Sequence, residues 1–199
     1  LSLPHGVLIY TNEDIKIGSI DQERNFKKFN RYDAIAVQNS LFKETIIKSG
    51  IASDKIFVLG SARYCDEWVG QNKKILPRLK NLQPQNNMAL KVVFMTTRPN
   101  YKIHVERMLK TFDVLSKLTG IKVVIKPHTR SGEEAKIYEN LAIANVSGIS
   151  SVELCEWADV MLVIGSSILI ETLLQGKPVL YLKYLHENTT LYEEIGACW

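Results

Sequence analysis

The sequence predicts a doubly wound α/β fold, in which helices cover both faces of a parallel sheet. Short apolar runs rich in β-branched residues alternate with longer segments of helical periodicity, the pattern of repeated strand–helix–strand units. Two of these runs, 123–125 and 161–164, are apolar at every position, as in central strands buried on both faces. With 199 residues, 46% of them hydrophobic and 23% charged, the chain can form one domain or two small ones.

The expected strands are the short apolar runs bounded by polar or turn-forming residues. They are Val7–Tyr10, Ala34–Val37, Ile56–Leu59, Lys91–Thr96, Lys122–Lys126, Ala142–Asn145, Val160–Ile164 and Val179–Leu182. Helices are expected where apolar residues recur every three or four positions, several of them followed by glycine or proline. They are Ser40–Lys48, with Ser40 as its cap, then Lys102–Leu118, Glu133–Leu141, Val152–Trp157 and Ser167–Gln175.

A polar segment from Gly70 to Asn87 interrupts this alternation. It is rich in Asn and Gln and contains Pro77 and Pro84, which is typical of a linker, with room for a short helix near Ile75–Leu82. We therefore expect an incomplete α/β domain over residues 1–70, a linker over 71–87 and a fuller α/β domain over 88–199. Since the chain starts without Met and ends without a polar tail, we expect a fragment of a longer protein.

Charge and cysteine content narrow the classes of partner. The formal net charge is +4 without a long basic tract, so no nucleic-acid partner is expected. The small excess suits an anionic small ligand, or peripheral association with an anionic membrane surface. The three cysteines are widely spaced and form no CxxC pair, which predicts reduced thiols in a cytoplasmic protein. No run is apolar and long enough for a transmembrane segment.

Polar side chains follow three of the expected strands, where ligands bind in doubly wound sheets. Arg98 comes after the run ending at 96, and Lys126 and His128 come after the run 123–125, with Arg130 close behind. A neutral His128 could contact a base or a phosphate while Lys126 supplies charge. The alternatives are a loop histidine that satisfies its own hydrogen bonds, and solvated surface arginines. His104 and His186 are expected at the surface.

The third strand end carries Gly165, Ser166 and Ser167, which open a helix. Glycine allows a close approach of ligand to backbone, and a helix start presents unpaired N–H groups and a partial positive charge. These groups can hold a phosphate without a metal, although a serine could instead simply cap the helix. Glu171, one turn further, could accept hydrogen bonds from a ribose diol or could only complement the helix dipole.

Several common motifs are absent from the sequence. There is no GxGxxG, no GxxxxGK[ST], no GxSxG and no Asp-x-Asp pair. These absences disfavour a dinucleotide enzyme and exclude the common ATPase class. The chain also lacks the Asp-x-Asp pair with which metal-dependent sugar transferases bind a divalent cation. A transferase of this sequence would neutralise its leaving group with Lys, Arg and the helix dipole, and no metal or other cofactor is expected.

The C-terminal half resembles the donor-binding half of GT-B glycosyltransferases and their relatives. The resemblance is carried by Trp157-Ala158-Asp159-Val160, Gly165-Ser166-Ser167, Glu171 and Gly176-Lys177-Pro178-Val179-Leu180. The relatives include CDP-glycerol glycerophosphotransferases, capsule and surface-polysaccharide transferases, and UDP-N-acetylglucosamine 2-epimerases. In the N-terminal part, Pro4-His5-Gly6 is similar to the His-Gly of the first two groups, and Gly60-Ser61-Ala62-Arg63 to their Gly-x-x-Arg segment.

The resemblance implies two Rossmann-like domains, of which this chain holds the C-terminal one, truncated at its end, and a remnant of the N-terminal one. It implies that Ser166, Ser167 and His128 face the donor phosphates and that Glu171 faces the ribose. His5 would be the general base that deprotonates an acceptor hydroxyl. Arg63, Lys126 and Arg98 would help to stabilise the leaving phosphate.

Two departures bear on the activity. The glycerophosphotransferases usually show an Asp-Tyr-Ser-Ser stretch where this chain has Val163-Ile164-Gly165-Ser166-Ser167. The epimerases usually show a Gly pair and two adjacent Glu, whereas Glu171 is followed by Thr172. The best fit is then a metal-independent transferase that moves a sugar or alditol phosphate from a nucleotide donor to a polysaccharide or lipid-linked acceptor. A nucleotide-sugar 2-epimerase, which would need carboxylates such as Glu13 and Asp14, and a non-catalytic binding domain are the alternatives.

Overall fold

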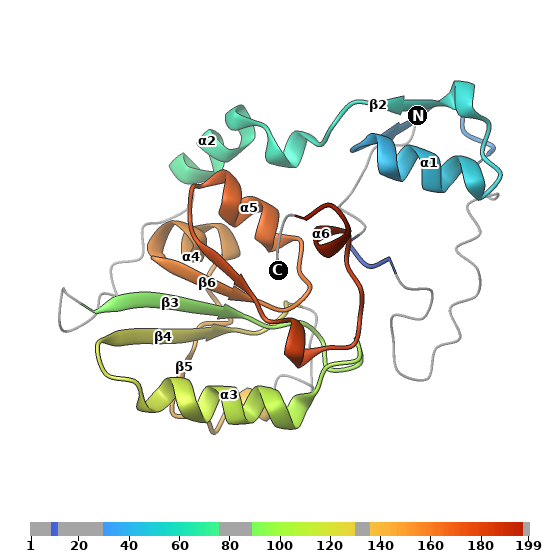
Figure 1. The fold of residues 1–199 in the computed structure, drawn as a ribbon. Helices are drawn as coiled ribbons and strands as arrows, with labels where there is room; N and C mark the ends of the chain where they lie inside the picture. Colours follow the sequence, from blue (N-terminus) through green and yellow to red (C-terminus); the bar gives the residue numbers. More distant parts are fainter. Residues whose placement is uncertain (1–8, 12–29, 76–88, 130–135, 197–199) are drawn as a thin grey trace.

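The computed structural model describes residues 9–11, 30–75, 89–129 and 136–196, without the side chain of Lys73. The described residues form a small N-terminal unit and a larger α/β unit (Figure 1). In the small unit, strands β1 (Ile35–Val37) and β2 (Ile56–Val58) pair in parallel, and helix α1 (Ser40–Lys48) connects them. Its core contains Val37, Ile46 and Ile56. Helix α2 (Asp66–Ile75) follows, with a 3-10 turn before it.

The larger unit is built on a five-stranded sheet in the order β5-β4-β3-β6-β7, with every pairing parallel. The strands are β3 (Leu90–Met95), β4 (Ile121–Lys126), β5 (Ala144–Asn145), β6 (Val160–Val163) and β7 (Val179–Tyr181). From β3 the chain moves outward to β4 and β5, then returns to the other side of β3 for β6 and β7. The direction of winding therefore reverses between β3 and β6, which confirms the expected doubly wound fold.

Helices cover both faces of this sheet (Figure 1). Helix α3 (Val105–Lys117) lies on one face, and α4 (Ser151–Trp157) and α5 (Ile168–Leu174) lie on the other. Successive residues of β3 alternate between the two cores: Val92 and Phe94 pack with α3, whereas Val93 and Met95 pack with α4 and α5. A strand with apolar side chains on both faces has to be covered twice, which is why the central strands are continuous apolar runs.

The N-terminal residues 9–11 pack against the end of the chain. Tyr10 forms an antiparallel bridge with Thr190, and the backbone N–H of Leu191 donates to the carbonyl of Ile9 at 2.7 Å. Both Ile9 and Tyr10 are buried in the core that α4 and α5 cover. Helix α6 (Leu191–Glu194) begins directly after Thr190. The contact lies close to the loop that precedes α5, because the Tyr10 hydroxyl donates to the carbonyl of Gly165.

Most expected elements are present, with their ends moved by one to three residues, but four details differ. Asn39 rather than Ser40 caps α1, because its Oδ1 accepts from the N–H of Phe42 at 2.8 Å. Helix α2 extends through 71–75, where an irregular linker was expected. In the expected helix 133–141, the described residues 136–138 form only a 3-10 turn. Of the expected strand 7–10, the described residues 9 and 10 contribute only the bridge at Tyr10.

Candidate functional site

A cavity of about 240 Å³ opens where the winding of the sheet reverses. It lies at the carboxyl ends of β3, β4 and β6, which is where doubly wound sheets bind ligands. Its lining comes from these three strand ends, from the start of α4 and from the 3-10 turn before α2. The lining residues are Arg63, Met95, Thr96, Lys126, Pro127, His128, Thr129, Ser151, Ser166, Ser167 and Ile168.

The loop after β6 gives the cavity backbone donors. Gly165 has φ +43°, a left-handed conformation that favours glycine, and Ser166 and Ser167 follow it before α5 begins. Within the described residues, the N–H groups of Ser166 and Ser167 have no hydrogen-bond partner. The Ser166 hydroxyl accepts weakly from the N–H of Ile168 at 3.4 Å, whereas Ser167 makes no side-chain cap. Capping therefore occupies only one of the two serines.

Thr96 adds a buried donor that sequence reasoning missed. It is the first residue after β3, it is 4% exposed, and its Oγ1 has no hydrogen-bond partner in the described part of the chain. A buried hydroxyl left unpaired costs roughly 1–3 kcal/mol, so such a group in a cavity wall marks a place where a ligand can bind. Its position directly after β3 could have indicated this role, but Arg98 was predicted from that segment because of its charge.

Lys126 and His128 enter the cavity from the end of β4, as their positions predicted. Lys126 is only 4% exposed, and its Nζ donates to the carbonyl of Ser147, which fixes the ammonium group beside the cavity. Burial lowers the pKa of Lys126, because an ammonium group loses hydration there. A bound anion would restore part of that lost solvation, so the site favours a negatively charged ligand.

Arg63 and Glu171, predicted as separate contacts, form an ion pair between Nε and Oε1. The Glu171 side chain is 8% exposed and does not line the cavity, whereas that of Arg63 is 43% exposed and does. Among the described residues, Glu171 Oε2 and the two terminal nitrogens of Arg63 have no hydrogen-bond partner. Arg63 can thus offer its terminal nitrogens to an anion while Glu171 holds its Nε.

Other predicted residues lie elsewhere. Arg98 follows β3 but does not line the cavity, and Gly165 supports the loop without lining it. His5 and Arg130 lie outside the described residues, as do the carboxylates at positions 13 and 14. The surface position expected for His186 is wrong: it is 3% exposed, and burial lowers its pKa to about 4.

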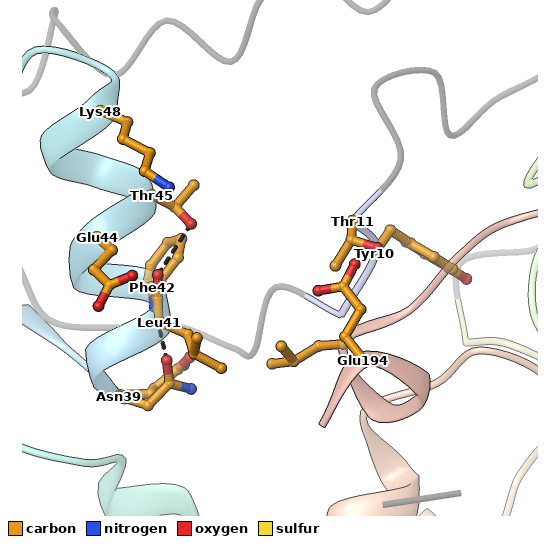
Figure 2. Close-up of a pocket in the computed structure, with 11 residues that line it drawn as sticks. Tyr10, Thr11, Asn39, Leu41, Phe42, Glu44, Thr45, Lys48 and Glu194 are labelled. Atoms are coloured by element: carbon orange, nitrogen blue, oxygen red, sulfur yellow. Dashed lines mark hydrogen bonds between the residues drawn. The ribbon is translucent and has the colours of Figure 1, made fainter. Parts of the chain in front are cut away.

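A second cavity, of about 320 Å³, lies between helix α1 and the residues around Tyr10 and Leu191. Figure 2 shows helix α1 on one side of it and Tyr10, Thr11 and Glu194 on the other. The lining combines aromatic and aliphatic groups with amides, hydroxyls and charges. The lining residues are Tyr10, Thr11, Gln38, Asn39, Leu41, Phe42, Glu44, Thr45, Lys48, Leu191 and Glu194.

The described residues contain no helix long and apolar enough to cross a membrane. The same residues contain no group of three His, Cys, Asp or Glu side chains arranged to hold a metal ion.

Comparison with known proteins supports the fold. Neither a protein-family model nor a curated protein sequence matches the chain. Among solved structures, UDP-GlcNAc 2-epimerase from Methanocaldococcus jannaschii is similar to this chain, with a TM-score of 0.59, 16% identity and 89% of this chain covered. The same enzyme with bound UDP-GlcNAc and UDP also has a TM-score of 0.59 and 16% identity, with 82% covered. The wall teichoic acid polymerase TagF has a TM-score of 0.48 and 17% identity, with 90% covered.

The chain spans about half the length of these proteins, namely 53% and 48% of the epimerase chains and 48% of the polymerase. The similarity to the epimerase agrees with the GT-B-like α/β fold expected from the sequence.

Proposed function

We propose that this chain forms the nucleotide-donor half of a metal-independent transferase. The transferase moves a sugar or an alditol phosphate from a nucleotide-activated donor to a surface polysaccharide or related acceptor. The observation that carries the proposal is the cavity at the switch point of the sheet. It combines the N–H groups of Ser166 and Ser167 and the hydroxyl of Thr96, none of which has a partner among the described residues, with nearby cationic side chains, and this set of donors suits a diphosphate.

The chemistry follows from these donors. The acceptor oxygen attacks the anomeric carbon of the sugar, or the phosphorus of the alditol phosphate, and gives up its proton to a base, for which His5 is the candidate. The bond to the leaving phosphate breaks, and a nucleoside diphosphate or monophosphate departs with the electron pair. Arg63 and Lys126 neutralise the charge that develops on it and His128 donates a hydrogen bond to it, a contribution that is commonly the largest in catalysis.

The ion pair between Arg63 and Glu171 joins two parts of the proposed donor site. Glu171 Oε1 holds the guanidinium, and its Oε2 is left without a partner among the described residues. We assign the phosphates to Arg63 and the ribose to Glu171, as the family resemblance implies. Glu171 does not line the cavity itself, and its Oε2, the oxygen that does not hold Arg63, is the atom we assign to the ribose.

The second cavity suits the acceptor. Its aromatic side chain Phe42 and its surrounding hydroxyl and amide groups fit a polyhydroxylated chain. Thr45→Trp would fill this cavity from α1, where Thr45 is exposed. We expect that substitution to suppress transfer while leaving nucleotide binding unchanged.

The test measures nucleotide release from UDP- and CDP-activated donors, with and without a polyol-phosphate or oligosaccharide acceptor and with EDTA present. Release that requires the acceptor, survives EDTA and is reduced in Ser166→Ala/Ser167→Ala, which lacks the two hydroxyls that line the cavity, supports the transferase. Conversion of the donor to its C2 epimer without any acceptor would contradict the transferase and favour an epimerase. Absence of both turnover and nucleotide binding would favour a non-catalytic binding domain of the same fold.

A further inference from the structure

Two tyrosine hydroxyls from opposite ends of the chain contact consecutive carbonyls of the Gly165 loop. Tyr10 Oη donates to the carbonyl of Gly165 at 2.7 Å, and Tyr192 Oη donates to the carbonyl of Ser166 at 3.3 Å. Tyr10 and Tyr192 are 8% and 2% exposed. Neither tyrosine lines the cavity that contains Thr96, and Tyr10 lines the second cavity instead. The hydroxyls therefore contact the loop from outside the cavity proposed for the donor.

The direction of a carbonyl fixes the direction of the next N–H. In a trans peptide these two groups point in opposite directions across one rigid plane. The Gly165 carbonyl shares its plane with the Ser166 N–H, and the Ser166 carbonyl shares its plane with the Ser167 N–H. Tyr10 holds the Gly165 carbonyl, and Tyr192 together with the N–H of Leu169 at 3.1 Å holds the Ser166 carbonyl. Both N–H groups therefore point away from the tyrosine hydroxyls, on a loop whose residues Ser166 and Ser167 line the cavity.

We infer that Tyr10 and Tyr192 are positioning residues, which orient the Ser166 and Ser167 N–H groups toward the phosphates of a nucleotide donor. The inference deepens the proposed function and rests on it for the identity of the ligand. The unpaired hydroxyl of the nearly fully buried Thr96 in the same cavity is an independent sign that a polar ligand completes the site.

The surroundings of Tyr10 explain why this residue can act as a fixed donor. Its ring stacks on Tyr101 with the ring centroids 5.6 Å apart, and its backbone bridges to Thr190. Burial raises the pKa of Tyr10 to about 12, so the hydroxyl keeps its proton over the neutral range. A Cβ added to Gly165 would lie 3.0 Å from two atoms of the Tyr10 side chain, so any other residue at 165 would require Tyr10 to shift by a few tenths of an ångström.

The test compares three Tyr→Phe variants of the chain, with inorganic pyrophosphate and UDP as probes in calorimetric titrations. Tyr10→Phe and Tyr192→Phe each remove one hydroxyl from the loop and keep the ring. Tyr181→Phe is the matched control, because its buried hydroxyl contacts Thr190 and Glu193 rather than the loop. We expect Tyr10→Phe to weaken both probes roughly 3- to 10-fold, Tyr192→Phe to do so less, and Tyr181→Phe to leave the affinity unchanged.

Amide NMR of the free protein separates this inference from the proposed function. We expect the Ser166 amide resonance to move in Tyr10→Phe and that of Ser167 in Tyr192→Phe, with both unchanged in Tyr181→Phe. If the wild-type chain binds neither pyrophosphate nor UDP, the donor site is refuted, and these resonances alone decide whether the tyrosines orient the loop. Unmoved resonances, or equal affinity in Tyr10→Phe and wild type, would overturn the inference.

Discussion

Removing Arg63 should destabilise the protein mainly through what it leaves behind, the buried carboxylate of Glu171. Loss of one partner of a fully buried pair costs roughly 3–5 kcal/mol. The Glu171 side chain is 8% exposed but that of Arg63 is 43% exposed, so solvent screens part of the interaction. For Arg63→Ala we therefore expect a loss of about 2 kcal/mol in the free energy of unfolding.

Glu171→Gln removes the charge but keeps the shape of the side chain, so we expect a loss of about 1 kcal/mol or less. The double variant should then be more stable than Arg63→Ala alone, with a coupling energy of about 1–2 kcal/mol. Urea unfolding followed by circular dichroism at pH 7 gives the four free energies of this cycle. The exposed helical pair Asp113 and Lys117 is the control, for which no resolvable coupling is expected. If the losses in the free energy of unfolding of Arg63→Ala and Glu171→Gln simply add in the double variant, the two side chains do not form a stabilising ion pair.

Three further predictions concern single residues. Burial lowers the pKa of His186 from 6.5 to about 4 in the folded protein. Between pH 6.5 and pH 4 the unfolded state therefore binds a proton at His186 that the folded state does not. The free energy of unfolding should fall by roughly 3 kcal/mol as the pH falls from 6.5 to 4, and a pH series of urea melts should show a flatter dependence for His186→Gln. Gly165→Ala should cost about 2–3 kcal/mol, because φ is +43° and the added Cβ meets Tyr10; an unchanged melting temperature would contradict this. Iodoacetamide should modify exposed Cys65 and spare Cys155, whose pKa burial raises to about 11; mass spectrometry of the peptides shows which thiol reacts.

The central strands were predictable because their sequences allow few alternatives. A run such as Val123-Val124-Ile125, apolar on both sides and β-branched, fits a strand covered on both faces. The amphipathic α3 was predictable from its period, with Met108 and Phe112 buried as the pattern required. Capping by Asn39 rather than Ser40 was not, since both residue types cap helices well and the pattern does not choose between neighbours.

The parts of the site that the sequence did not indicate depend on contacts between distant residues. Tyr10 reaches Gly165 across 155 positions, and no local pattern marks a tyrosine as the partner of a distant carbonyl. His186 stands among polar neighbours, and its burial follows from its bridge to Ile103 and its packing against Tyr181. Position after a strand did indicate Lys126, His128 and the serines, because the carboxyl ends of parallel strands meet at one edge of the sheet.

The most direct test of the nucleotide-donor site measures thermal stability with UDP, CDP, CMP, GDP and ADP, and with sulfate as a control anion. A ligand that binds only the native state stabilises it by RT ln(1 + [L]/Kd), about 2.7 kcal/mol at one hundred times Kd. We predict a rise in melting temperature with one nucleotide, larger than that with sulfate, and a smaller rise in Ser166→Ala/Ser167→Ala, which removes the two hydroxyls but keeps the backbone N–H groups. Equal melting temperatures with all five nucleotides, or a rise no larger than that with sulfate, would contradict the assignment of the cavity.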